Sequence, residues 1–137
     1  MKKDPLTIGA FAIVLNAKGH VLISLRCDYP VWNLPGGKVE DGETSEMAVI
    51  REIKDLIGIY SKPEILDIVF LYSCIVTGGK LVLTDEACEH RYCHGGELPE
   101  NIKPRHRERI LDYFTRKPGD PVVQKKQTSG CLIPVRD

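Results

Sequence analysis

The sequence predicts an α+β fold. Apolar stretches of strand length outnumber helical patterns, and they precede and follow the first helical pattern in an irregular order. At 137 residues the chain has the size of one domain, long enough to bury a core and shorter than two domains usually require. We therefore expect a single domain over residues 1–137, with residues 117–137 as a tail that no pattern assigns.

The first two strands are expected at residues 8–16 and 21–26, which are short and rich in strand-forming residues. Asn16 and Gly19 supply turn chemistry between them, so the two strands should form a hairpin. Prolines and glycines then crowd residues 30–37. This composition predicts an irregular loop, with a short extended piece at Trp32.

A helix is expected to begin at Thr44 or Ser45, since either residue can cap its N-terminus, and to end at Gly58. At helical spacing an apolar stripe is formed by Val49, Ile53, Leu56 and Ile57. Glu52 lies at the edge of this stripe, and Asp55 follows three residues later on the same flank. The helix would therefore present two carboxylates to one side.

Further strands are expected at residues 65–77 and 80–84, joined as a hairpin through Gly78 and Gly79. Residues 91–93 could add another strand. A second helix is expected over residues 104–115, because a proline suits the first helical turn and a partial apolar stripe follows it.

Composition limits the class of partner and the compartment. The 19 basic and 19 acidic residues cancel, so we expect a small-molecule partner and no attraction to nucleic acid or to an anionic membrane. The five cysteines form no Cys-x-x-Cys pair, which favours reduced thiols and a cytoplasmic location. A secretory signal is not expected in the apolar residues 8–15, because a first strand explains them. No stretch has the length of a membrane span.

Two carboxylates beside a glycine loop suit a hard cation such as Mg²⁺, which prefers oxygen ligands and shares carboxylates with phosphate oxygens. The simpler alternative is that Glu52 and Asp55 belong to a solvated face and pair with Arg51 or Lys54. The glycine loop and the spacing over residues 36–59 favour the cation site.

Residues 37–59 resemble the Nudix box, in which Gly, Glu and Arg-Glu are followed by a closing Glu-Glu pair and a glycine. The matching residues are Gly37, Glu43, Arg51, Glu52, Ile53, Gly58 and Ile59. Asp55 replaces the first Glu of the closing pair conservatively, and Leu56 replaces the second. Residues 32–37, 85–93 and 97–99 are also similar to family elements, so the resemblance extends over about residues 8–115.

This resemblance implies an α/β/α sandwich around a mixed sheet, and the hydrolysis of a nucleoside diphosphate linked to another group, with Mg²⁺ or Mn²⁺. Glu52 would be a metal ligand or the general base. The other implied metal ligands are Gly37, Asp55, Glu86 and Glu89. Glu43 and Arg51 would form a structural ion pair. Trp32 would either stack on a base or belong to the core.

Leu56 occupies a position that normally holds a principal metal ligand. Either Glu86 or Glu89 restores the site, or the catalysis is weak or absent. The sequence therefore leaves two hypotheses, a pyrophosphohydrolase acting on a nucleotide or nucleotide-sugar diphosphate, and a nucleotide-binding or regulatory domain of the same fold.

Two other clusters offer alternative interpretations. The residues Cys88, His90, Cys93 and His94 could suggest zinc, but on a strand Cys93 points away from the other three. The basic residues Arg105, Arg107, Arg109, Arg116 and Lys117 surround the second helix. Because acidic residues interrupt this cluster, a solvated helix face is expected there.

Overall fold

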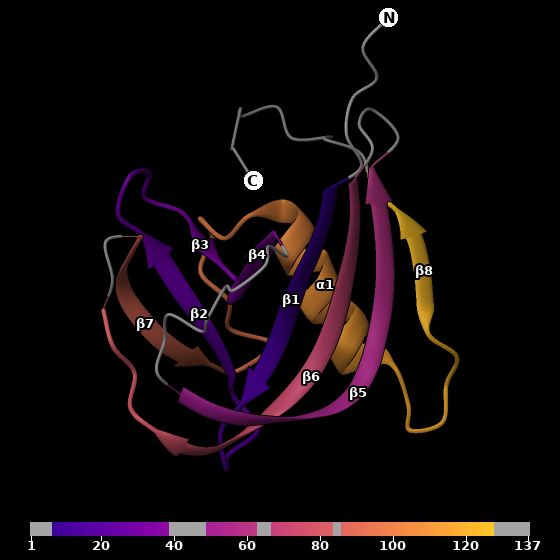
Figure 1. Cartoon of the computed structure of the whole chain (residues 1–137), viewed down its shortest axis with the longest axis horizontal. Helices are drawn as coiled ribbons and strands as arrows, with labels where there is room; N and C mark the ends of the chain where they lie inside the picture. Colours follow the sequence, from indigo (N-terminus) through magenta and orange to yellow (C-terminus); the bar gives the residue numbers. More distant parts are fainter. Residues whose placement is uncertain (1–6, 39–48, 63–66, 84–85, 128–137) are drawn as a thin grey trace, which may run out of the picture.

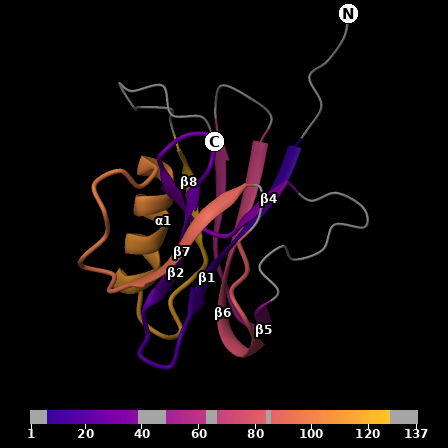
Figure 2. The ribbon, with the colours of Figure 1, turned by 90° about the vertical axis from the view of Figure 1, so that its left-hand side faces the viewer.

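The structure is a computed structural model that describes residues 7–38, 49–62, 67–83 and 86–127 (Figure 1). These residues form a mixed sheet of eight strands, with one helix packed on one of its faces (Figures 1 and 2). The elements in chain order are β1 Thr7–Leu15, β2 Val21–Arg26, β3 Trp32–Asn33, β4 Gly36–Lys38, β5 Val49–Lys62, β6 Asp67–Gly79, β7 Ala87–Cys93, α1 Pro104–Thr115 and β8 Val123–Lys126.

The sheet has the strand order β3-β2-β1-β6-β5-β8, and β4 pairs with β1 while β7 pairs with β2. The β1·β6 and β5·β8 pairs are parallel, and the other pairs are antiparallel. This arrangement confirms the predicted α+β class and the mixed sheet. The predicted hairpin of β1 and β2 is also confirmed, with Asn16 Oδ1 accepting hydrogen bonds from the backbone of Lys18 and His20, both at 3.0 Å.

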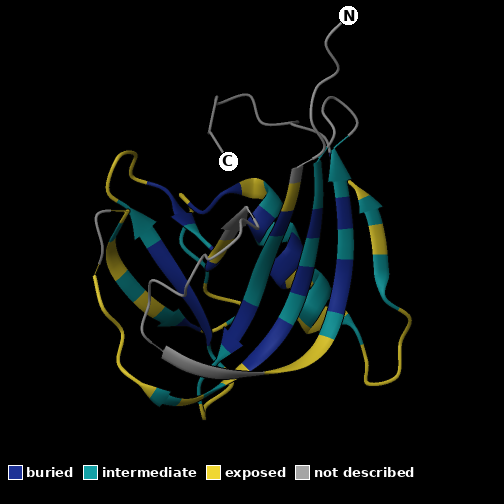
Figure 3. Ribbon diagram, viewed as in Figure 1, coloured by how far each residue is buried: buried dark blue, intermediate teal, exposed yellow. Residues whose placement is uncertain are grey.

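Alternation along the strands divides the core between the two faces of the sheet. On the α1 face the core is formed by Ile13, Val21, Ile23, Trp32, Leu34, Ile57, Tyr60, Val69, Leu71, Cys93, Ile102 and Ile110. On the opposite face Val14, Leu22 and Cys74 form a smaller buried cluster. Figure 3 shows buried positions along the central strands and on the side of α1 that faces them.

The helix expected to end at Gly58 is not formed where the structure describes it, because residues 49–58 belong to β5. This strand pairs antiparallel with β6 from Val49, opposite Gly79, to Lys62, opposite Asp67. Its β-branched residues suit a strand. Register shifts at three places let an apolar pattern of helical spacing fit a sheet, so that Ile57 and Tyr60 are both buried on the α1 face. The proposed caps Thr44 and Ser45 lie outside the described residues.

One other expectation about the elements is wrong. Residues 80–83 form no strand, so the predicted hairpin through Gly78 and Gly79 is absent, and β6 pairs with β1 and β5 instead. The tail that no pattern assigned contains β8, which lies parallel to β5. The second predicted helix is confirmed as α1, with proline in its first turn.

The cysteines also differ from expectation. Cys27 and Cys88 form a disulfide with a Cα–Cα distance of 5.1 Å, whereas Cys74 and Cys93 are buried and lie outside this disulfide. Cys131 lies outside the described residues. Because the partner cysteines are 61 residues apart and share no local motif, spacing alone did not indicate their pairing. In the part of the chain that the structure describes, no helix has the length and apolar character needed to span a membrane.

Candidate functional site

The two carboxylates of the motif occupy neighbouring positions on β5. Glu52 pairs with Ile75 and Asp55 with Ser73, and these partners are two residues apart on β6. Because alternate residues of a strand share a face, positions 52 and 55 lie on the same side of the sheet, with a bulge at Lys54 between them. The bulge thus places positions 52 and 55 on one side of a strand, as the sequence predicted for a helix.

Asp55 is exposed and faces α1. Burial raises the pKa of Tyr113 on α1, the charge of Arg116 opposes this shift, and the negative charge of Asp55 adds to it. Leu56, by contrast, pairs with Tyr72, which packs against the buried cluster on the opposite face. Asp55 and Leu56 therefore point to opposite sides of the sheet.

The other predicted ligands lie elsewhere in the sheet. Gly37 on β4 pairs with Ala10 of β1, so that β1 and β6 separate it from β5, a distance of about 14 Å at the usual strand spacing. Glu89 lies on β7, and β6, β1 and β2 separate that strand from β5. Glu86 immediately precedes β7. The structure therefore does not bring Gly37, Glu86 or Glu89 beside Asp55.

The remaining carboxylates of the described segments give no alternative metal centre. Glu89 forms an ion pair with Arg91 at 3.1 Å, and both side chains are about half exposed. Among the described residues no three His, Cys, Asp or Glu side chains are grouped closely enough to hold a metal ion. Glu43 lies outside the described residues, so its ion pair with Arg51 stays a prediction.

Trp32 belongs to the core, with 4% of its surface exposed. The guanidinium of Arg91 lies over its ring at 4.5 Å from the centroid. Its backbone N–H donates to Asn101 O at 3.0 Å, and its carbonyl accepts from Lys103 N at 3.0 Å. Stacking on a base would require Arg91 to move away.

The residues of the possible zinc cluster lie in four separate environments. His90 Nδ1 lies 2.7 Å from Ser24 Oγ, and His90 Nε2 lies 2.8 Å from the carbonyl oxygen of Val82. Cys88 is in the disulfide, and Cys93 is buried on the α1 face. His94 Nδ1 accepts from the backbone N–H of Gly96.

Sequence reasoning missed a polar network between α1 and strands β5 and β8. Arg109, expected on a solvated face, is 2% exposed, and its guanidinium lies between the rings of Phe11 and Tyr60 at 5.3 and 5.4 Å. Its Nε donates to Gln127 Oε1 at 3.0 Å, and burial lowers its pKa to about 10. Its spacing from Tyr113, four residues later on the same helical face, was the available signal.

The same network fixes β8 against α1. Asp112 accepts from Tyr60 Oη at 2.9 Å and from Lys125 Nζ at 2.8 Å. Glu108 accepts from Lys125 Nζ at 3.1 Å and from Gln127 Nε2 at 3.0 Å. Donors and acceptors satisfy each other, which indicates a structural role.

Two titratable groups are buried at the start of α1. His106 Nδ1 accepts from the backbone N–H of Leu34 at 2.8 Å, and burial, assisted by the charge of Arg109, holds its pKa well below the usual value. Lys103 is 3% exposed. Burial, with the charges of Arg26 and Lys62 next in size, lowers its pKa to about 7.

The fold and the motif can be compared with known proteins. A family model described as NUDIX domain matches residues 5–117. The chain belongs to the NUDIX family. Among curated relatives, this NUDIX chain is 35% identical to a Bacillus subtilis protein named as an 8-oxo-dGTP diphosphatase, with 78% of this chain and 79% of the relative covered. It is 38% identical to an ADP-ribose pyrophosphatase of Methanocaldococcus jannaschii, with 77% and 72% covered.

The fold agrees with that assignment. A NUDIX hydrolase from Nitrosomonas europaea superimposes with a TM-score of 0.76 at 21% identity, covering 93% of this chain and 81% of the other. At this level of identity the likeness concerns the fold. This likeness includes the mixed sheet.

Proposed function

We propose that this chain is a NUDIX pyrophosphohydrolase that cleaves the diphosphate linkage of a small nucleotide substrate with the help of a divalent cation. The observation that carries the proposal is the family match over residues 5–117, which includes the whole carboxylate motif. Hydrolysis of a pyrophosphate bond is also the activity named for both curated relatives.

Glu52 and Asp55 are the residues that would hold the cation, as Mg²⁺ or Mn²⁺. The pair suits such an ion, since Mg²⁺ is commonly bound by one or two carboxylates together with substrate phosphates and water. When bound, the cation would neutralise charge on the phosphates and lower the pKa of a water molecule. Asp55 is exposed, so a phosphate chain can reach it from solvent. Glu52, on the same side of β5, is the candidate base for that water.

The named activities of the two relatives support this substrate class. Substrates to be compared are 8-oxo-dGTP, ADP-ribose and a nucleotide sugar, each with Mg²⁺ and with Mn²⁺. Hydrolysis of such metabolites would also suit a cytoplasmic protein.

The test measures hydrolysis of these substrates by the wild type and by two variants. Glu52→Gln and Asp55→Asn should each lower kcat/KM by at least about 100-fold, because loss of a residue outside the ligand set already costs 10- to 100-fold. Glu100→Gln, an exposed carboxylate before α1, is the matched control and should retain full activity. Full activity in Glu52→Gln would place the chemistry elsewhere.

A nucleotide-binding domain with little hydrolysis is the second candidate. Leu56, which stands where the motif normally has a carboxylate and faces the opposite side of the sheet, favours it. The two candidates are separated by measuring nucleotide binding and turnover on the same preparation. Binding without turnover on any substrate would select the second candidate.

A further inference from the structure

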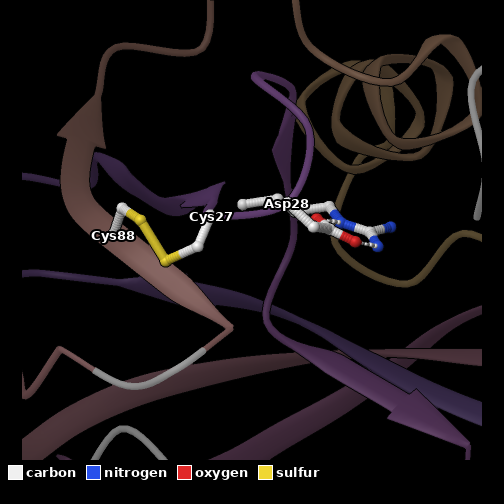
Figure 4. Close-up of a disulfide and its surroundings, with 4 residues drawn as sticks. Cys27, Asp28 and Cys88 are labelled. Atoms are coloured by element: carbon white, nitrogen blue, oxygen red, sulfur yellow. Dashed lines mark hydrogen bonds and ion pairs between the residues drawn. A yellow bond between two sulfur atoms is a disulfide. The ribbon is translucent and has the colours of Figure 1, made fainter.

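The Cys27–Cys88 disulfide lies at the surface, at the end of the β2·β7 pair (Figure 4). Both cysteines are exposed, whereas Cys74 and Cys93 are buried. Thiol–disulfide exchange requires that a thiolate reach one of the two sulfur atoms. Among the described cysteines, Cys27 and Cys88 are therefore the accessible pair.

The surroundings of the bond explain what it holds in place. Arg26 pairs with Ala87 at the last position of the β2·β7 ladder, next to a register shift between Leu25 and Arg26. The disulfide joins Cys27, the residue after β2, to Cys88, which the register shift leaves unpaired between Ala87 and Glu89 on β7. A backbone hydrogen bond from Cys27 N to Glu86 O, at 3.1 Å, is a further contact at this end. The bond thus fastens the end of a ladder that is already irregular.

This end of the ladder is connected to Trp32 along both strands. From Cys27 the chain turns through residues 28–31, where Val31 N donates to Tyr29 O, and enters β3 at Trp32. From Cys88, β7 continues for three residues to Arg91, whose guanidinium covers the Trp32 ring. A displacement of either strand end would change how Arg91 covers Trp32.

We propose that Cys27 and Cys88 form a reversible thiol–disulfide exchange site, whose reduction by a thiol of the glutathione class loosens the β2·β7 end and the Arg91 cover on Trp32. One thiolate attacks a cysteine sulfur, breaking the S–S bond and forming a mixed disulfide. A second thiolate then displaces the cysteine thiolate. In total two thiols are oxidised to one disulfide, and two electrons and two protons convert the cystine into two cysteines.

Contacts further along the β2·β7 ladder favour re-formation of the disulfide after reduction. Ser24 Oγ and His90 Nδ1 lie 2.7 Å apart, and the β2·β7 register continues to Val21 opposite Cys93. These contacts keep the two strands together when the disulfide is open. The two thiols therefore remain near each other, which favours intramolecular oxidation over reaction with a second protein molecule.

The test uses the full chain in glutathione buffers of graded redox ratio, under nitrogen. Trp32 is the single tryptophan, so its fluorescence reports its own surroundings. We expect one two-electron transition. Thiol alkylation of Cys27 and Cys88 and the change in Trp32 fluorescence should give the same midpoint. Reduction should also accelerate amide exchange in residues 87–91 by at least about tenfold, with β1 and β6 unchanged.

Two variants serve as controls, and none of the readouts depends on hydrolysis. Cys74→Ala should respond to glutathione as the wild type does, because the bridged pair is intact. Cys27→Ser with Cys88→Ser should show the reduced-state fluorescence in every buffer. If that variant does not fold, the wild-type titration decides alone. Resistance to glutathione, or reduction that leaves Trp32 fluorescence and β7 exchange unchanged, would refute the proposal.

Discussion

Lys103 illustrates how burial controls the charge of a single side chain. Its pKa of about 7 in the folded protein lies below the usual value of 10.5, because burial and nearby cations disfavour the charged form. The unfolded chain therefore binds more protons than the folded chain between these two values. It follows that stability rises with pH across this range and falls as pH drops towards 7.

We predict that this dependence disappears when Lys103 is replaced by methionine. Lys103 should make the wild type about 2 kcal/mol more stable at pH 9 than at pH 7, and Lys103→Met should lack that increment. Urea unfolding at pH 7 and at pH 9 measures this increment. The pKa shifts of Lys62 and other groups affect both proteins equally and cancel in the comparison. Equal pH slopes in the two proteins would exclude Lys103 as the titrating group.

Residue roles were predictable where they depend on local chemistry. Asn16 was expected in a turn, and its side chain accepts hydrogen bonds from the backbone two and four residues later. Arg109 was expected on a solvated face, yet Phe11 and Tyr60 surround it from two different strands. Such neighbours are brought together by the sheet order, which the local pattern does not contain.

At the scale of elements, β4 depends on one glycine. Gly36 has φ +137°, and a Cβ at this position would meet the carbonyl of Ala10 and lie 2.7 Å from Phe11 Cα. These are backbone atoms of β1 and cannot move aside. Gly19 also has positive φ, at +75°, but a Cβ there meets no atom within 4 Å.

We therefore predict that Gly36→Ala lowers the free energy of unfolding by about 3 kcal/mol or more, since overpacking adds to backbone strain. Gly19→Ala, as the matched control, should cost only about 1 kcal/mol, because strain acts there alone. Urea unfolding of both variants provides the comparison. Equal losses would mean that β4 does not lie against β1 as described.

The motif segment shows why the sequence misled at this scale. Residues 49–58 carry an apolar pattern of helical spacing together with strand-forming β-branched side chains, so both structures are locally reasonable. Pairing with β6 along the whole length of β5 decides between them. That pairing is invisible in the sequence, whereas α1, which has a proline in its first turn, could be placed directly.

Leu56→Glu tests the described register. On a strand, the new carboxylate would face Tyr72 and away from Asp55, so metal affinity should not rise, and the protein should lose about 1–2 kcal/mol through burial of polar atoms. Isothermal titration with Mn²⁺ and urea unfolding measure the two effects. A tenfold gain in affinity would instead indicate the helix expected from the sequence, in which positions 52, 55 and 56 share one side.

At the scale of the whole molecule, the sheet separates two regions that the sequence placed in one site. Asp55 lies on β5, near one edge, while Glu89 and the disulfide lie on β7 beyond β2. The sequence could predict the family and the class of chemistry from spacing within residues 37–59. It could not predict the distance between this segment and residues 86–89, because that distance is fixed by strand order.

The disulfide should therefore contribute to global stability independently of the carboxylate site. It joins residues 61 apart in the chain, and a chain-entropy estimate for a loop of this length is about 4 kcal/mol. We predict that replacing both Cys27 and Cys88 with serine lowers the free energy of unfolding by about 2–4 kcal/mol under oxidising conditions. In excess reductant, wild type and variant should unfold at nearly the same urea concentration. A difference that persists in reductant would mean that the serine side chains, and not loss of the cross-link, destabilise the protein.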